Sequence, residues 1–137
     1  MSQVWIIGEV LIDLIPEGSE RKPIVGGGPA NAAKALSKLG IDTQFIDGIS
    51  TDDYGLMAKV ELVSTGVKLN YIKYSDKPTC LAIVSLSDSG SASYEFVIKN
   101  TATFDFTPDW LPNPQTERPS VLHIGTLATA VEPGASV

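Results

Sequence analysis

Apolar and polar positions along the first half of the chain predict strands and helices in alternation. A nearly continuous apolar run over residues 4–14 has the length and character of a buried strand. A short strand is expected to end at Val25, a helix to follow over residues 29–39, and another strand to cover residues 43–49. This order of elements predicts an α/β fold, in which helices pack against a parallel sheet.

A second helix is predicted to begin where Asp52 or Asp53 can cap its first turn. It is expected to reach Ser64 and to stop at Gly66, because glycine tolerates the backbone conformation that ends many helices. Its apolar residues recur at helical spacing and predict one buried face, formed by Leu56, Met57, Val60 and Val63.

Two strand-like runs in the second half, Thr79–Leu86 and Ser91–Ile98, are joined by a polar segment that is typical of a hairpin turn. The first run has apolar residues on both of its faces, so both faces need a cover. We expect the hairpin to project from the main sheet as a lid. The alternative is an added antiparallel edge of the same sheet. A last strand is predicted at residues 120–125.

The composition argues against several classes of protein. A formal charge of −6 disfavours a nucleic-acid partner. No apolar stretch approaches the ~20 residues that span a bilayer, and the N-terminus lacks the pattern of a secretion signal. We therefore expect no membrane partner and a cytoplasmic location. The single cysteine, Cys80, lies in an apolar run where a buried thiol is expected. The only histidine, His123, has no second histidine or cysteine that would complete a metal site, so no metal ligand is predicted.

A run of three glycines leads directly into the first predicted helix. Gly26, Gly27 and Gly28 allow the backbone to approach a ligand closely, and Pro29 suits the first turn of a helix. The first-turn N–H groups lack partners within the helix, and the Asn31 amide can both donate and accept. The run fits neither a Walker loop nor a dinucleotide-binding fingerprint. The junction predicts a site for a ligand with many hydroxyl groups; a turn that merely starts the helix is the alternative.

Asp13 lies between Ile12 and Leu14 near the end of the first apolar run. A carboxylate is costly to bury without a partner, so its side chain is expected to face a polar cavity or to lie where the strand has left the core. Carboxylate oxygens accept hydrogen bonds from hydroxyl groups. Asp13 is therefore a candidate for the same ligand site, and a partly exposed residue at a strand end is the alternative.

Three segments in this order resemble the N-terminal signature of the ribokinase-like (PfkB) carbohydrate kinases, with the bacterial fructokinases as the most similar branch. They are Gly8–Asp13, Gly26–Ala33 and Phe45–Gly55. The resemblance continues through the rest of the chain, to the runs Thr79–Val84 and Leu122–Leu127.

This resemblance implies the N-terminal portion of a ribokinase-like fold, a parallel sheet with flanking helices and a small β-strand lid. Lid strands are expected at about residues 14–25, 67–74 and 79–99. The family's second signature, Asp-Thr-x-Gly-Ala-Gly-Asp, provides the anion hole and the catalytic base, and it does not occur in this sequence. Residues 1–137 are therefore expected to form the sugar-binding half of a longer kinase, to lack the ATP-binding half, and to be inactive alone.

The resemblance assigns sugar-binding roles but no catalytic, cofactor-binding or metal-binding residue to this chain. A carboxylate and an amide would bond sugar hydroxyls, two glycines would let the sugar ring lie against the backbone, and two apolar lid residues would form a roof. In that order, these residues are Asp13, Asn31, Gly27, Gly28, Ala82 and Phe96.

The activity that the resemblance implies is transfer of the γ-phosphoryl group of ATP to a sugar hydroxyl, with Mg²⁺ and a monovalent cation as candidate cofactors. It also implies a homodimer formed through the β lid. Gly28 and Pro29 stand where ribokinases proper carry Lys-Gly, which favours a fructokinase-like ligand over ribose. Kinases of ribose, of a nucleoside or of aminoimidazole riboside stay open, as does a non-catalytic sugar-binding or dimerisation module. A dinucleotide-binding domain is disfavoured, because no glycine fingerprint follows the first strand.

Overall fold

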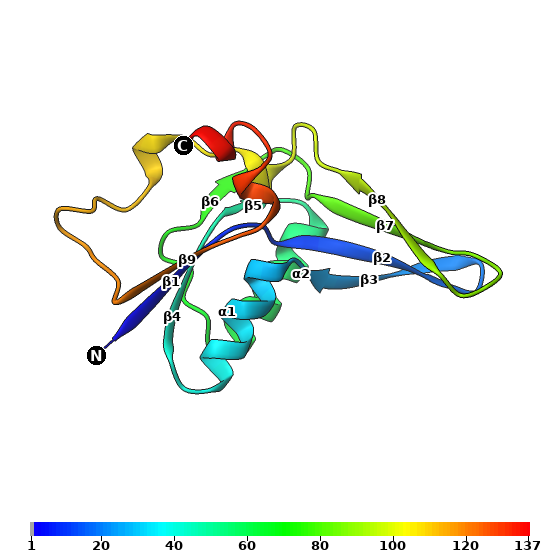
Figure 1. Ribbon diagram of the computed structural model, residues 1–137, viewed down its shortest axis with the longest axis horizontal. Coiled ribbons are helices and arrows are strands. Elements are labelled where there is room, and N and C mark those ends of the chain that lie inside the picture. The colour runs from blue at the N-terminus through cyan, green and yellow to red at the C-terminus, as the bar shows by residue number, and fades with distance from the viewer. Residues whose placement is uncertain (1) are drawn as a thin grey trace.

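The computed structural model describes residues 2–137. Most of the strands in this range belong to two sheets (Figure 1). The first sheet is parallel, with the order β4-β1-β9, and consists of β1 (Gln3–Ile7), β4 (Asp42–Ile46) and β9 (Val121–Ile124). Helix α1 (Gly28–Lys38) packs against β1 and β4, and α2 (Asp53–Ser64) lies beside α1. The α/β class with a parallel sheet is confirmed.

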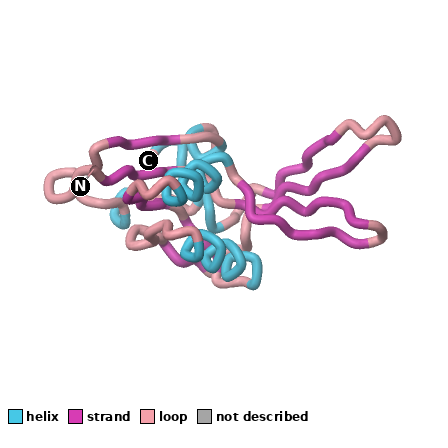
Figure 2. The backbone as a smooth tube through the Cα atoms, turned by 90° about the horizontal axis from the view of Figure 1, so that it is seen from below, coloured by secondary structure: helices cyan, strands magenta, loops and turns pink. Residues whose placement is uncertain are grey.

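The second sheet projects from the body of the molecule as two long hairpins (Figure 2). One hairpin consists of β2 (Leu11–Glu17) and β3 (Glu20–Gly26), and the other of β7 (Leu81–Leu86) and β8 (Ala92–Val97). The sheet has the order β3-β2-β7-β8, in which β2 and β7 are parallel. The predicted hairpin therefore forms part of a separate lid sheet and is not an added edge of the first sheet.

Residues 67–74 do not belong to this lid, which corrects the expectation for them. Lys68 forms a parallel bridge with Gln44, and β6 (Lys73–Ser75) pairs in parallel with β5 (Gly48–Ser50). The physical reason is burial, since Val67 lies in the main core and Leu69 packs against it. Burial of these two apolar side chains in the core holds the segment against the body of the molecule and outside the projecting sheet.

Two runs predicted as single strands are each broken into two. Residues 4–14 divide into β1 and β2 at Gly8–Val10, and residues 43–49 divide into β4 and β5 at Asp47. The two breaks face one another, because the Val10 N–H donates to Asp47 Oδ2 at 2.8 Å. At this point the first run leaves the parallel sheet and enters the lid. Its length therefore reflects two strands in different sheets.

Of the four residues predicted on the buried face of α2, only Met57 packs against the core. Leu56, Val60 and Val63 are 57%, 59% and 54% exposed, whereas Gly55, Ala58 and Leu62 are buried. A Cβ atom on Gly55 would lie 1.9 Å from the carbonyl oxygen of Ser50. The helix backbone therefore approaches β5 closely at Gly55, where there is no side chain. This close approach buries the face of α2 that carries Gly55 and Ala58. The predicted cap is confirmed: Asp52 accepts from the Gly55 N–H at 2.7 Å.

Two apolar clusters form the core. The larger one joins the parallel sheet to both helices, and the smaller one, which includes Cys80, lies beneath the lid. Burial raises the pKa of the Cys80 thiol to about 12, so it is a buried neutral group as expected. Four short 3-10 turns complete the chain: η1 (Ala102–Phe104), η2 (Pro108–Trp110), η3 (Leu127–Thr129) and η4 (Gly134–Ser136). Within residues 2–137, no helix combines the length and apolar character that crossing a membrane requires.

Asp52→Ala is expected to lower the free energy of unfolding by about 1–3 kcal/mol, because it removes a helix cap and two bonds to the next segment. Besides Gly55, Asp52 accepts from the Thr79 N–H at 2.9 Å and the Thr79 hydroxyl at 2.6 Å. Burial raises the pKa of Asp52, but these hydrogen bonds outweigh burial and leave the pKa below its ordinary value. The stabilisation is therefore present above the ordinary aspartate pKa and is lost as the pH falls through the lowered one.

Urea unfolding of the chain at pH 7 and below pH 4 measures this effect. The matched control is Asp53→Ala, which removes the neighbouring exposed carboxylate in the first turn of α2. Equal losses in the two variants at pH 7, or a loss for Asp52→Ala that does not shrink in acid, would contradict the assignment.

Candidate functional site

A cavity of about 320 Å³ lies where the lid meets the body of the molecule. It is enclosed by the β1–β2 junction, the start of α1, the end of the lid strand β8 and the segment after β9. Its lining residues are Glu9, Leu11, Asp13, Gly27, Gly28, Tyr94, Phe96, Thr126 and Leu127. Four of the six residues expected at the sugar site are among them.

Asp13 reaches the cavity from β2, where it pairs with Ile24 of β3 and Ala82 of β7. Its carboxylate lies over Gly26, since a Cβ atom on Gly26 would lie 2.1 Å from Asp13 Oδ2. Burial raises the pKa of Asp13, and none of the ion pairs among residues 2–137 involves it. This half-buried carboxyl group can therefore accept hydrogen bonds from a ligand.

The glycine turn, which connects the lid strand β3 to α1, forms another part of the cavity wall. Gly27 has a φ of 103° and caps α1, and a Cβ atom there would lie 2.4 Å from the carbonyl oxygen of Glu9. Gly28 and Pro29 then begin the helix. Only glycine fits at position 27, because both the backbone angle and the contact with Glu9 exclude a side chain. The turn leaves backbone exposed to the cavity, as the sequence predicted.

Asn31 and Ala82 do not line the cavity. Asn31 lies in the first turn of α1 with its side chain exposed, and its N–H donates to the Gly27 carbonyl oxygen at 2.9 Å. Ala82 is 1% exposed and belongs to the cluster beneath the lid, in register with both Asp13 and Phe96. Their contacts with a sugar stay predictions.

Two aromatic side chains of β8 form the lid side of the cavity. Tyr94 and Phe96 stack with their ring centroids 6.3 Å apart and an interplanar angle of 15°. Both rings are substantially exposed, at 58% and 45%. The expected roof residue Phe96 is thus accompanied by Tyr94, and the pair offers a flat apolar surface to a ligand.

Glu9 is a carboxylate at the back of the cavity that sequence reasoning did not assign to the site. It is 1% exposed, and it accepts hydrogen bonds from the N–H groups of Thr126 at 3.0 Å and Ala128 at 3.2 Å, and from the Thr126 hydroxyl. Burial raises the pKa of Glu9, but these bonds and its own backbone N–H outweigh burial, so the pKa lies below its ordinary value. The sequence feature that could have indicated Glu9 is that the apolar run over residues 4–14 contains a second carboxylate besides Asp13. The Glu9 partners Thr126 and Ala128 are 117 and 119 residues away, so no local pattern shows them.

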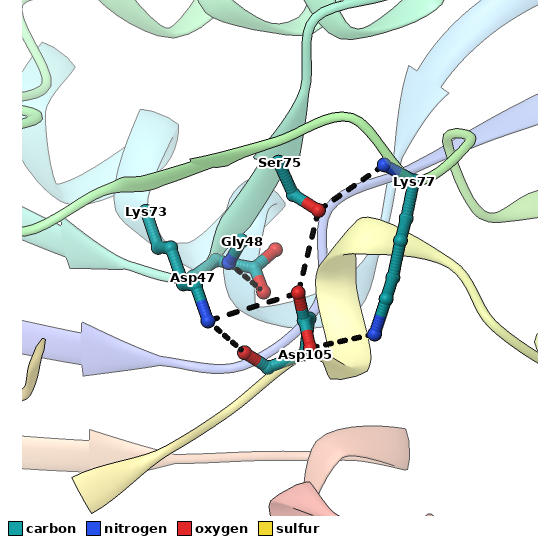
Figure 3. Close-up of polar contacts among 6 residues, drawn as sticks. All are labelled: Asp47, Gly48, Lys73, Ser75, Lys77 and Asp105. Atoms are coloured by element: carbon teal, nitrogen blue, oxygen red, sulfur yellow. Dashed lines mark hydrogen bonds and ion pairs between the residues drawn. The ribbon is translucent and has the colours of Figure 1, made fainter. Parts of the chain in front are cut away.

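Asp47 is a second buried carboxyl group at the same junction, and Figure 3 shows its bond from the Gly48 N–H. Asp47 is fully buried and accepts from the N–H groups of Val10 at 2.8 Å and Gly48 at 2.7 Å, and it bonds the Thr103 hydroxyl. Burial and the nearby charge of Glu9 raise the pKa of Asp47 well above its ordinary value. Asp47 was not recognised from the sequence, because it falls within the single strand predicted over residues 43–49.

Figure 3 also shows how the segment after η1 is fixed close to Asp47. The Asp105 carboxylate pairs with Lys77 at 2.7 Å and with Lys73 at 3.7 Å, and the Ser75 hydroxyl donates to it at 3.3 Å. The bond from Lys77 is the main reason that the pKa of Asp105 lies below its ordinary value. These contacts join β6 and its following loop to η1, which carries Thr103.

The arrangement of side chains offers a polar ligand the Asp13 carboxyl group, the Thr126 hydroxyl and two aromatic rings. None of the lining residues is basic, and the Cys80 thiol is buried and neutral. His123 is exposed on β9 and does not line the cavity. Among residues 2–137, no group of three or more His, Cys, Asp or Glu side chains is placed to hold a metal ion.

Comparison with known proteins matches residues 1–136 to a family model described as pfkB family carbohydrate kinase. The fructokinase of Escherichia coli is 31% identical over 134 residues, which are 96% of this chain and 43% of that protein. The aminoimidazole riboside kinase of Salmonella typhimurium is 28% identical over 114 residues, which are 82% of this chain and 36% of that protein.

Solved structures of fructokinases have the same fold. One from Xylella fastidiosa with bound ATP covers 98% of this chain at 25% identity, with a TM-score of 0.89. A double mutant from Vibrio cholerae O395, bound to fructose, ADP and a potassium ion, covers 99% of this chain at 26% identity, with a TM-score of 0.82. The matched regions are 42% and 44% of those chains, so this chain spans less than half the length of these relatives.

Gly27→Ala is expected to destabilise the chain by at least about 2 kcal/mol, because it combines an unfavourable φ with a backbone clash. Gly18→Ala is the matched control: Gly18 has a φ of 64°, but a Cβ atom there meets nothing within 4 Å. That control should cost only about 1 kcal/mol. Urea unfolding of both variants measures the difference, and equal losses would show that the contact of Gly27 with Glu9 does not constrain the turn.

Proposed function

We propose that this chain, which belongs to the pfkB family of carbohydrate kinases, binds the sugar in an enzyme that transfers the γ-phosphoryl group of ATP to a sugar hydroxyl. Fructose is the favoured sugar. The observation that carries the proposal is the cavity in which Asp13, the Gly27–Gly28 turn and Phe96 come together.

Each part of the cavity suits one property of a sugar. Asp13 can accept hydrogen bonds from hydroxyl groups, and the backbone at Gly27 and Gly28 allows the ring to approach closely. Phe96 and Tyr94 can cover the apolar C–H face of the ring. In phosphoryl transfer the protein acts mainly by positioning and charge stabilisation. This chain would supply the positioning of the acceptor hydroxyl and the exclusion of water around it.

ATP and its metal ions are assigned to the part of the protein beyond this chain. The cavity has no basic lining residue that could pair with phosphates, and residues 2–137 hold no cluster of acidic, His or Cys side chains that fits a metal. When bound, Mg²⁺ would neutralise charge on the transferring phosphate. A monovalent cation, like the potassium ion in the Vibrio cholerae structure, would also bind outside this chain.

The proposal includes a homodimer formed through the lid sheet. Apolar side chains of three lid strands are exposed: Ile24 is 40%, Leu86 57% and Val97 40% exposed. A sheet that projects from the body of a protein cannot cover both of its own faces. The lid of a second copy is the occupant that would bury these side chains.

Aminoimidazole riboside is the second candidate substrate. The relative from Salmonella typhimurium supports it, and so does the stacked pair of Tyr94 and Phe96, because a flat aromatic surface suits a heterocyclic base as well as a sugar ring. Calorimetric titration of the whole protein with each compound distinguishes them. Tighter binding of the riboside than of fructose would reverse the preference stated above.

The 137-residue chain alone is expected not to form any sugar phosphate. The segment that provides the family's catalytic base and anion hole, Asp-Thr-x-Gly-Ala-Gly-Asp, does not occur in its sequence. The measurement is a coupled ADP-release assay with fructose and ATP, compared with a reaction without protein. ATP-dependent product above that background would show that this chain contains catalytic residues.

In the whole protein, Asp13→Ala and Asn31→Ala are both expected to weaken fructose binding and to leave ATP binding nearly unchanged. A lost bond to a charged group costs about 1.5–3 kcal/mol and a lost neutral bond about 0.5–1.5 kcal/mol, so Asp13→Ala should weaken binding more. Calorimetry with each ligand measures both effects. Asp109→Ala, which removes an exposed aspartate outside the cavity, is the control. Unchanged fructose affinity in either variant would remove that residue from the site.

A further inference from the structure

We propose that Thr126 is a specificity-determining residue of the sugar cavity, and that Glu9 positions it so that its hydroxyl oxygen only accepts hydrogen bonds from the ligand. This inference rests on the proposed function and deepens it. It follows that the bound sugar must have a hydroxyl group that donates a hydrogen bond to Thr126, in the segment after β9.

The first step concerns the hydrogen atom between Glu9 and Thr126. The Glu9 carboxylate accepts two backbone N–H groups at Oε2, from Thr126 and Ala128, and contacts the Thr126 hydroxyl at Oε1. The pKa of Glu9 is below its ordinary value, so the group is ionised at neutral pH and has no hydrogen to donate. The hydrogen in this contact must therefore come from Thr126.

The second step concerns what remains available on the Thr126 oxygen. A hydroxyl group has one hydrogen and two lone pairs, and the hydrogen is already committed to Glu9. Thr126 is exposed and lines the cavity. A Cβ atom on Gly28 would lie 3.6 Å from Thr126 Oγ1, so this oxygen lies beside the glycine turn. The oxygen can then accept, but not donate, a bond from a ligand on that turn.

The third step combines Thr126 with Asp13. The two residues line the same cavity, from β2 and from the segment after β9, and both offer oxygen acceptors. A bound molecule must bring hydrogen donors to both. Neutral polyhydroxylated sugars do so, whereas a fluorine, ether oxygen, carboxylate or phosphate at either position brings no donor and leaves the protein acceptors unpaired.

Three variants of the whole protein test the role of Thr126, with D-fructose as the probe. Thr126→Val keeps the shape and removes the hydroxyl, so fructose should bind about 2- to 10-fold more weakly. Thr126→Ser keeps the hydroxyl and should restore most of that affinity. Circular dichroism and thermal unfolding show whether each variant is folded. Thr129→Val is the control, because its hydroxyl bonds the backbone oxygen of Thr126 and does not line the cavity.

Glu9→Gln tests whether the Thr126 hydroxyl acts only as a hydrogen-bond acceptor toward the ligand. A glutamine can keep both N–H bonds at the Oε2 position with its carbonyl oxygen, and it can donate to Thr126 from its NH₂ group at the Oε1 position. The Thr126 hydrogen is then free to point at the ligand. A series of monodeoxyfluoro-fructoses, each with fluorine in place of one hydroxyl, should contain one member that wild type binds much more weakly than fructose. Glu9→Gln should reduce that preference severalfold, and Thr126→Val should abolish it.

The outcomes separate this inference from the function on which it rests. Fructose binding that changes less than 2-fold in a folded Thr126→Val variant would overturn the role of Thr126 and leave the proposed function intact. A fluoro-sugar preference that is the same in Glu9→Gln and wild type would overturn the positioning role of Glu9. Failure of the wild-type protein to bind fructose would overturn the proposed sugar and the inference together.

Discussion

The junction between β1 and β2 is the constraint on which the rest of the structure depends. Within three residues, Gly8–Val10, the chain leaves a parallel sheet that packs on helices and enters a lid that projects from the body of the molecule. Such a junction exposes backbone groups that neither sheet can pair. Two buried carboxyl groups stabilise it: Asp47 accepts from the Val10 N–H, and Glu9, which is part of the junction, accepts from N–H groups of the segment after β9.

These two carboxyl groups lie close enough to influence one another, and their pKa values shift in opposite directions. Glu9 receives bonds from Thr126 and Ala128 and keeps its charge, whereas Asp47 is fully buried beside that charge and favours its protonated form. Two neighbouring carboxylates in an apolar interior are costly to ionise together. Burial and the charge of Glu9 thus act together to raise the pKa of Asp47, whereas hydrogen bonds lower the pKa of Glu9. The Thr103 hydroxyl contacts both Asp47 and the Val10 carbonyl oxygen, the latter at 3.0 Å, and so connects Asp47 to the junction.

The sequence was sufficient to predict the elements that follow local rules. The Asp52 cap, the glycine turn before α1 and the hairpin of β7 and β8 each depend on residues close together in the chain, and all three are present. Predictions failed where contacts between residues far apart in the sequence determine the local structure. Asp47 breaks a strand because of Val10, residues 67–74 pack against the body and not the lid, and α2 buries Gly55 and Leu62 because small residues let it approach β5. For the cavity, Asp13, Gly27, Gly28 and Phe96 follow from a linear motif, but Thr126 does not.

The distribution of chemistry in the cavity bears on how the proposed sugar site would contribute to phosphoryl transfer. Contacts that hold a sugar equally well before and during phosphoryl transfer lower the free energy of both states, so they increase affinity without increasing the rate of the chemical step. Under the proposed function, acceptors such as Asp13 and Thr126 would act on the rate by fixing the direction of the reacting hydroxyl toward the phosphate. Rigidity is then the property that matters, and the buried bonds of Glu9 and Asp47 supply it by fixing the lid, the glycine turn and the segment after β9 at one junction.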